Sequence, residues 1–212
     1  MSRLPLMLKL EGKRIAVVGA GSVASRHIKK LIEVGVKEII VYSPSLHPDL
    51  QMYVKQERFK WEKENVTSTW SVDADFVFLT TNDSMLHKSI YQYKKPYQLV
   101  YVADNPALSD FHFPMTIKKG ALTIALSTGG ASPTYAKKIM KQIESNLSDS
   151  IEADLLFLEK ARKRVLESEL SGLVRKKILQ QCTTALVLQN PSREQVLEKI
   201  IEEEANSTTE KK

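Results

Sequence analysis

The stretch Ile15-Ala16-Val17-Val18-Gly19-Ala20-Gly21-Ser22-Val23-Ala24 decides the fold that we predict for this chain. Its first four residues form an apolar run of the kind that is buried on both faces of a parallel sheet. After the glycines, helical spacing continues through Ile28, Leu31 and Ile32 until Gly35. A Gly-x-Gly-x-x-Ala pattern between a strand and a helix is the fingerprint of a dinucleotide-binding βαβ unit.

Each position of this fingerprint has a physical role. Gly19 permits the tight turn, and Gly21 lets a pyrophosphate approach the backbone without meeting a Cβ atom. Ala24 keeps the helix close to the sheet, and the unpaired amides at the helix start bind the phosphates. The alternative is a glycine turn that only connects a strand to a helix. We expect Gly19, Gly21 and Ala24 to contact a dinucleotide.

The acidic residue of the fingerprint is missing. An Asp or Glu that hydrogen-bonds the ribose 2′-hydroxyl usually ends the second strand. Here the second strand, Ile39 to Tyr42, is followed by Ser43 and Pro44. Ser43 can hydrogen-bond a ribose, but it carries no charge to repel a 2′-phosphate. The residues alone therefore leave the choice between NAD and NADP open.

The rest of the chain extends this unit and then changes character. Apolar runs at residues 76–79 and 99–103 predict two more buried strands, with a helix at 86–93 between them. Strands alternating with helices indicate an α/β fold with a Rossmann-type parallel sheet. Beyond it we predict a hairpin, a Gly-Gly loop and then helices only, one of them spanning residues 173–188. The predicted segments are 1–113 (Rossmann domain), 114–147 (mixed α/β segment), 148–205 (helical domain) and 206–212 (disordered tail).

Composition narrows the function classes. The 212 residues carry a net charge of +6, which calls for an anionic partner. Nucleic acid is not expected, because the cations are spread over several helices and no aromatic-interleaved signature appears. No apolar window reaches membrane-spanning length, and the start shows no signal peptide, so we expect a cytoplasmic protein. The single cysteine, Cys182, is read as a small buried hydrophobe rather than a reactive thiol.

Asp104 follows the apolar run at residues 99–103, at the edge where the carboxyl ends of the strands meet and ligands bind. It is a candidate acid/base, and the alternative is that it caps its own Asn-Pro turn. Asp83 is read as a helix N-cap rather than a catalyst. His87 and His112 lie near this edge, but no histidine pair has metal-ligand spacing, so we expect structural or surface roles and no metal site.

Four stretches resemble one known family, the precorrin-2 dehydrogenases, which form the dehydrogenase/ferrochelatase module of sirohaem synthases. The similarity runs from Leu8 to about Leu147. The fourth of the stretches, a Ser-Thr-Gly-Gly-Ala-Ser-Pro loop after a Rossmann unit, is the most distinctive. The stretches are Gly19 to Arg26, Thr80 to Asp83, Val102 to Pro106 with Phe113-Pro114, and Leu126 to Pro133.

The resemblance implies NAD-dependent oxidation of precorrin-2 to sirohydrochlorin, in sirohaem or cobalamin biosynthesis. It implies a homodimer formed largely by the region after the Rossmann domain. Asp104 falls on the general base of the family, and Thr128 stands where some fused members carry a phosphorylated serine. The expected cofactor contacts are Gly19, Gly21, Ser22, Val23, Ala24, Ser43, Pro44, Thr80 and Thr81, and the expected substrate contacts are Ser127, Thr128, Gly129 and Gly130.

The substrate that the resemblance implies also accounts for the positive charge, because precorrin-2 carries eight carboxylates. Five lysines flank the Gly-Gly loop: Lys118, Lys119, Lys137, Lys138 and Lys141. We expect the macrocycle to lie between the Rossmann edge and residues 127–132 while Asp104 accepts a ring proton. Two alternatives stay open: a bifunctional enzyme that also inserts Fe²⁺ or Co²⁺ through transient contact, and a non-catalytic NAD(H)-sensing module. Since the fused methyltransferase module is not present in the sequence, we expect a stand-alone dehydrogenase.

Overall fold

The computed structural model describes residues 3–209, and its contacts divide the chain into two compact units. The first unit is Met1–Phe113 and the second is Pro114–Lys212. The sequence predicts a boundary at the same place and a further one after residue 147. Strand β7 (Leu122–Leu126) and helix α5 (Ile151–Leu166), which lie on either side of residue 147, are in contact within the second unit.

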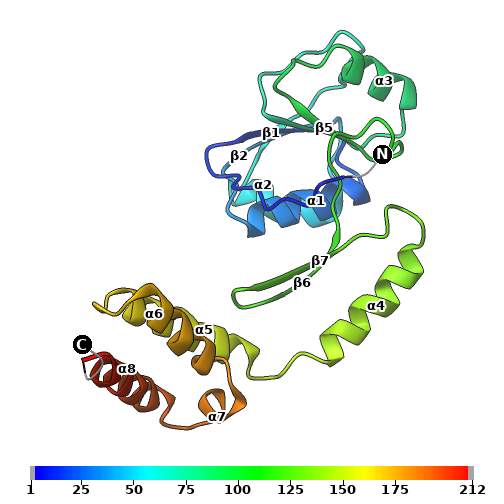
Figure 1. Ribbon diagram of the computed structural model, residues 1–212. Coiled ribbons are helices and arrows are strands. Elements are labelled where there is room, and N and C mark those ends of the chain that lie inside the picture. The colour runs from blue at the N-terminus through cyan, green and yellow to red at the C-terminus, as the bar shows by residue number, and fades with distance from the viewer. Residues whose placement is uncertain (1–2, 210–212) are drawn as a thin grey trace. The chain divides into compact units, whose positions relative to one another are not determined.

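The first unit is built on a parallel sheet of five strands in the order β3-β2-β1-β4-β5. Figure 1 labels β1, β2 and β5 of this sheet. Its register sets Val18 beside Tyr42 on one side and Leu79 on the other, so the carboxyl ends of the three central strands meet at one edge. The predicted Rossmann-type α/β fold is confirmed. The strands are β1 (Arg14–Val18), β2 (Glu38–Tyr42), β3 (Lys60–Glu62), β4 (Phe76–Leu79) and β5 (Leu99–Val102).

Helices cover both faces of this sheet, because alternate residues of each buried strand point to opposite sides. Ile15 and Val17 pack with the apolar stripe of α1 (Ser22–Glu33). Ala16 and Val18 pack instead in the core that contains Ile90 of α3 (Ser84–Gln92). The short α2 (Gln51–Lys55) follows a 3₁₀ turn at Pro48–Leu50.

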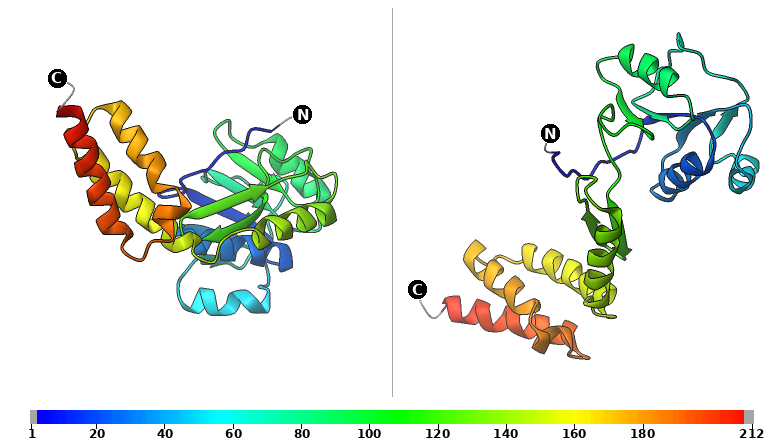
Figure 2. Two further views of the ribbon diagram at one scale, coloured as in Figure 1. Left: turned by 60° about the horizontal axis from the view of Figure 1, so that its bottom comes forward. Right: turned by 90° about the vertical axis from the view of Figure 1, so that its right-hand side faces the viewer.

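The second unit begins with an antiparallel hairpin of β6 (Met115–Lys119) and β7, which turns at Gly120 with a φ of +55°. Helix α4 (Pro133–Ser145) packs on β6 and is capped by Ser132, whose hydroxyl accepts the Tyr135 amide. Helices α5, α6 (Gly172–Cys182) and α8 (Arg193–Thr209) then lie side by side around a shared core, as both views of Figure 2 show. The short α7 (Ala185–Leu188) precedes α8.

Two predicted helical boundaries differ from the structure. The single helix predicted for residues 173–188 is broken after Cys182, where the hydroxyls of Thr183 and Thr184 donate to the carbonyls of Gln180 and Gln181. Such side-chain bonds compete with the continuing helix. Helix α8 continues to Thr209, past the predicted start of a disordered tail at Asn206, and residues 210–212 lie outside the described residues.

The sequence predicts that Cys182 is a buried hydrophobe and that no segment has membrane-spanning length. Cys182 is fully buried and burial raises the pKa of its thiol, which confirms a buried hydrophobe rather than a reactive nucleophile. Within residues 3–209 no helix combines the length and the apolar character that crossing a bilayer requires.

Candidate active site

The glycine turn leaves β1 in a conformation that only glycine adopts easily. Gly19 has a φ of +92°, and a Cβ built on it would lie 3.0 Å from the Thr80 carbonyl carbon and from two atoms of Thr81. The backbone that follows β4 therefore closes on Gly19 from one side. The Gly19 amide donates to the Tyr42 carbonyl at 2.9 Å, which joins the turn to the end of β2 as well.

Gly21 differs from Gly19, because the space around it is open. It is the N-cap residue of α1, and among residues 3–209 no heavy atom apart from its chain neighbours lies within 4 Å of the position of a Cβ on it. Within the described residues 3–209 no side chain caps the first turn of α1, and that turn contains no acidic residue. Ser22 is exposed and Val23 is half-buried. Free amides beside an open glycine form a cradle that fits the diphosphate of a dinucleotide.

The residues after β2 contribute mainly structure. Ser43 is buried, and its hydroxyl donates to the Ser45 carbonyl at 2.8 Å. Its own carbonyl accepts the Trp61 indole N–H at 2.8 Å. The hydroxyl proton that the sequence offers to a ribose is thus used locally, while Pro44 is exposed.

An acidic group does lie near this point in space, and the sequence pattern alone did not identify it. Glu62, at the end of β3, is paired in register with Tyr42 at the end of β2. Burial raises the pKa of Tyr42, and the negative charges of Glu62 and Glu64 raise it further. Glu62 also forms a 2.5 Å ion pair with Lys60. The parallel pairing of β2 with β3 places this carboxylate at the edge.

Thr80 and Thr81 follow β4 and meet the glycine turn. The Thr80 hydroxyl is buried, 2.9 Å from the Val18 carbonyl and 3.2 Å from the Gly19 carbonyl. Thr80 therefore braces the turn from within. Thr81 is half-buried, and its hydroxyl lies 2.9 Å from Nε2 of His87.

Asp104 belongs to the same chain of contacts. Its Oδ1 lies 2.7 Å from Nδ1 of His87, a ring that is only 1% exposed, whereas the Asp104 side chain is 39% exposed. The turn that follows is capped by Asn105, whose Oδ1 accepts the Ala107 amide at 3.1 Å. Asp104 is thus directed to His87 rather than to its own turn.

Helix α3 places His87 in this chain. Its N-cap, Asp83, accepts the amides of Met85 and Leu86, which confirms the N-cap prediction. His87 lies one turn later and points into the protein. From the sequence, only a structural or surface role is predicted for His87, with no part in the site. The available signal was its place in the first turn of a helix that starts at the same sheet edge as Asp104.

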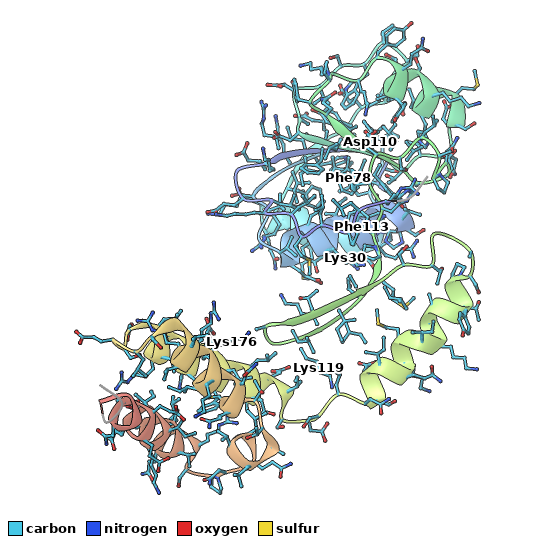
Figure 3. All side chains as sticks on the ribbon, viewed as in Figure 1. Lys30, Phe78, Asp110, Phe113, Lys119 and Lys176 are labelled. Atoms are coloured by element: carbon cyan, nitrogen blue, oxygen red, sulfur yellow. The ribbon has the colours of Figure 1, made fainter. Side chains whose placement is uncertain are left out.

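An aromatic cluster supports β5 from the α1 side. His27 of α1 lies 4.8 Å from the Tyr101 ring and 4.6 Å from the Phe113 ring, measured between centroids. Phe78 and Phe113, labelled in Figure 3, are 5.8 Å apart in the same cluster. Burial, helped by the positive charges of Lys30 and Arg26, lowers the pKa of His27 to about 4. The ring is therefore neutral at physiological pH.

The loop at residues 127–130 belongs to the second unit. Gly129 and Gly130 have φ values of +63° and +88°, and both Cβ positions are open. The Ser127 hydroxyl accepts the Gly129 amide at 3.2 Å, and the half-buried Thr128 hydroxyl lies 3.4 Å from the Ser132 amide. The flanking lysines are exposed except Lys119, which is half-buried and labelled in Figure 3.

Among residues 3–209, no three or more His, Cys, Asp or Glu side chains gather in a way that would hold a metal ion. At one edge of the first unit the structure brings together four predicted site residues, Gly19, Thr80, Thr81 and Asp104. Two residues that were not predicted, His87 and Glu62, lie at the same edge.

Two family models match the chain. Residues 6–115, just over half of it, match the model described as "Putative NAD(P)-binding". Residues 119–146 match the model described as "Sirohaem biosynthesis protein central". The first match covers the glycine turn, Thr81, His87 and Asp104, and the second covers the loop at residues 127–130.

Curated relatives and a solved structure agree with these matches. A precorrin-2 dehydrogenase of Bacillus subtilis (strain 168) is 30% identical over 161 residues, which cover 76% of this chain and 99% of that protein. One from Priestia megaterium is 29% identical, covering 74% of this chain and 77% of that protein. The solved structure titled "SirC, precorrin-2 dehydrogenase" has a TM-score of 0.79 at 23% identity, covering 96% of this chain and 100% of that one. That structure supports the fold.

Proposed function

Because this chain belongs to the precorrin-2 dehydrogenase family, we propose that it oxidises precorrin-2 to sirohydrochlorin with a nicotinamide dinucleotide as the electron acceptor. One observation carries the proposal. The open cradle at Gly21 and the exposed carboxylate of Asp104 lie at the same sheet edge, and the glycine turn is connected to Asp104 from Gly19 through Thr81 and His87. Ligands of open α/β sheets bind at this edge.

The cradle binds the cofactor. The amides at the start of α1, beside Ser22 and Val23, hold the diphosphate, and Ala24 keeps the helix close to the sheet. Thr80 holds the turn in shape, and Thr81 lines its inner wall. A bound nicotinamide would serve as the hydride acceptor. Overall, precorrin-2 loses one hydride and one proton, so that sirohydrochlorin, the reduced cofactor and H⁺ are formed.

Asp104 receives the proton. As a carboxylate it accepts a ring proton from the tetrapyrrole as the hydride leaves, and the exposure of its side chain gives the substrate access to it. A well-placed base contributes about 10²–10⁴-fold to such a step. Anaerobic assay of Asp104→Ala with precorrin-2 is the direct test. Near-normal sirohydrochlorin formation by this variant would remove Asp104 from the mechanism.

We propose NAD rather than NADP as the preferred cofactor. The carboxylate of Glu62 lies at the end of β3, beside the β2 end where the ribose of a dinucleotide binds. A negative charge at that place disfavours a 2′-phosphate, and it compensates for the acid that is missing after Tyr42. Steady-state assays with each dinucleotide decide between them, and comparable kcat/KM values for NAD and NADP would contradict this preference.

The loop at Ser127, Thr128, Gly129 and Gly130 is proposed to contact the tetrapyrrole. Its backbone is open to a large ligand at both glycines, and lysines of β6 and α4 supply positive charge for the carboxylates. Thr128→Val tests this role. We expect a raised KM for precorrin-2 with an unchanged Kd for the dinucleotide, and an unchanged KM would argue against the contact.

A homodimer is proposed for the working protein. Within residues 3–209 the hairpin β6–β7 forms a sheet of only two strands, with Leu122, Ile124 and Leu126 half-buried on β7. A two-stranded sheet gains stability from further pairing or packing. Sedimentation analysis at micromolar concentration tests this proposal, and a monomer at every concentration would contradict it.

Metal insertion is the second candidate activity. Chelation also removes protons from pyrrole nitrogens, and an exposed carboxylate such as Asp104 is suited to that step. Incubating sirohydrochlorin with Fe²⁺ or Co²⁺ and following the absorption spectrum tests it. The non-catalytic sensing module predicts dinucleotide binding without any turnover of precorrin-2, so the anaerobic assay separates it from both enzymes.

A further inference from the structure

We propose that His87 is a positioning residue for Asp104: its ring holds one carboxylate oxygen in place and leaves the other free to accept the substrate proton. This inference rests on the proposed function and deepens it. The basis is a continuous chain of contacts from the Thr81 hydroxyl through both ring nitrogens of His87 to Oδ1 of Asp104.

The protonation pattern follows from what each partner can donate. An ionised carboxylate only accepts hydrogen bonds, so the 2.7 Å contact requires the proton to be on Nδ1 of His87. The Thr81 oxygen already accepts the Asp83 amide at 3.2 Å, and its own proton is free to be donated to Nε2. A neutral His87 therefore has both ring nitrogens satisfied and one defined tautomer.

Burial makes this arrangement rigid. His87 is 1% exposed and lies in α3, one turn after the Asp83 N-cap, so its ring has little freedom to rotate. The side chain of Asp104 is 39% exposed, and in residues 3–209 no group hydrogen-bonds its Oδ2. Oδ1 is thus held by a buried ring, and Oδ2 has no such partner among the described residues. A base fixed in this way loses less freedom when the substrate arrives.

The same series of contacts connects Asp104, the proposed base, to the cofactor cradle. Thr81 contacts His87 through its hydroxyl, and its amide nitrogen and methyl carbon lie against the inner side of Gly19. The turn that holds the dinucleotide and the carboxylate that takes the proton therefore share one support. Their relative position is set by packed groups instead of by a mobile loop.

The first test compares two substitutions of His87 in the full-length protein. In His87→Asn the amide nitrogen takes the place of Nδ1 and can donate to Asp104, whereas His87→Leu fills the space without a donor. We expect His87→Leu to lower kcat by up to about 100-fold, with KM for each substrate nearly unchanged. His87→Asn should keep most of the kcat that His87→Leu loses. Lys88→Ala, an exposed neighbour on α3, is the matched control and should retain wild-type kcat.

A double-substitution cycle separates positioning from general damage to the fold. If His87 acts through Asp104, His87→Leu has no further effect on kcat once Asp104 is already alanine. Equal thermal midpoints of the variants would show that the fold is kept. The proposal is overturned if the two losses multiply, if His87→Leu keeps kcat near wild type, or if His87→Asn is as impaired as His87→Leu.

A spectroscopic readout makes the inference independent of turnover. Long-range ¹H–¹⁵N correlation spectra of the ¹⁵N-labelled protein report which ring nitrogen of His87 carries the proton. We expect the Nδ1–H tautomer, and we expect Asp104→Ala to weaken that preference. An Nε2–H tautomer in the wild-type protein would overturn the positioning role. If the wild-type protein does not oxidise precorrin-2, the proposed function fails, and the spectra still decide the role of His87.

Discussion

The amide nitrogen and the methyl carbon of Thr81 both lie 3.0 Å from the point that a Cβ on Gly19 would occupy. Residue 19 is therefore confined by two independent constraints. Its φ of +92° disfavours any side chain, and the backbone after β4 leaves no room for one. Because Thr81 also contacts His87, a displacement at residue 19 would reach Asp104 through Thr81 and His87.

Replacing Gly19 by alanine should damage stability and binding together. The left-handed conformation alone costs about 1–2 kcal/mol for a residue with a Cβ, and the backbone contact at 3.0 Å adds to it. Gly35→Ala is a matched control, because its φ is +85° but, in the part of the chain that the structure describes, no heavy atom apart from its chain neighbours lies within 4 Å of its Cβ position. We expect a larger loss of unfolding free energy for Gly19→Ala than for Gly35→Ala in urea titrations. Equal losses would show that Thr81 yields without cost.

Gly21→Ala should have the opposite signature. Gly21 has a φ of −77° and an open Cβ position, so alanine fits the fold without strain. The added methyl would occupy the space proposed for the diphosphate. We expect an unchanged thermal midpoint and a dinucleotide Kd at least about ten-fold higher, equivalent to about 1.4 kcal/mol. Fluorescence titration with the reduced dinucleotide measures it. An unchanged Kd would place the phosphates elsewhere.

The fold was predictable because its signals are local. The apolar run at residues 15–18 and the glycines after it specify strand, turn and helix without help from distant residues. The N-cap of α3 at Asp83 was predictable for the same reason. The break after Cys182 was not, because Thr183 and Thr184 end α6 through side-chain bonds that periodicity does not register.

The site was harder to predict, because its partners are distant in the sequence. Asp104 and His87 are 17 residues apart, and only the pairing of β4 with β5 brings their segments together. From the sequence, Asp104 was equally suited to capping its own turn, a role that Asn105 takes in the structure. Glu62 is brought to the end of β2 by parallel pairing of β2 with β3, so no acid at the end of β2 itself indicated it.

Glu62→Gln should relax the discrimination against NADP. Removing one negative charge beside the ribose lowers the repulsion of a 2′-phosphate by about 1 kcal/mol, or about five-fold in the NADP to NAD ratio of kcat/KM. Glu38→Gln is the matched control, because Glu38 is an exposed residue at the opposite end of β2. A ratio that shifts equally in both variants would mean that net charge, rather than the position of Glu62, sets the preference.

His27 should make the first unit sensitive to mild acid. Its pKa is about 4 in the folded protein against an ordinary value of 6.5, because the half-buried ring is desolvated among aromatic side chains. Between these two values the unfolded chain binds a proton that the folded chain does not. Stability should therefore fall as the pH drops from about 6.5 to about 4, with no contribution from His27 at neutral pH or above.

His27→Leu isolates this contribution, because leucine cannot titrate and is close to histidine in size. We expect urea unfolding of the variant to show a shallower loss of stability between pH 6.5 and pH 4 than the wild-type protein shows. Asp73 and Asp75, whose lowered pKa values also make folding weaker in acid, are common to both proteins and cancel in the comparison. If the difference in stability between the two proteins is the same at every pH, the ring of His27 is protonated as easily in the folded state as in the unfolded chain.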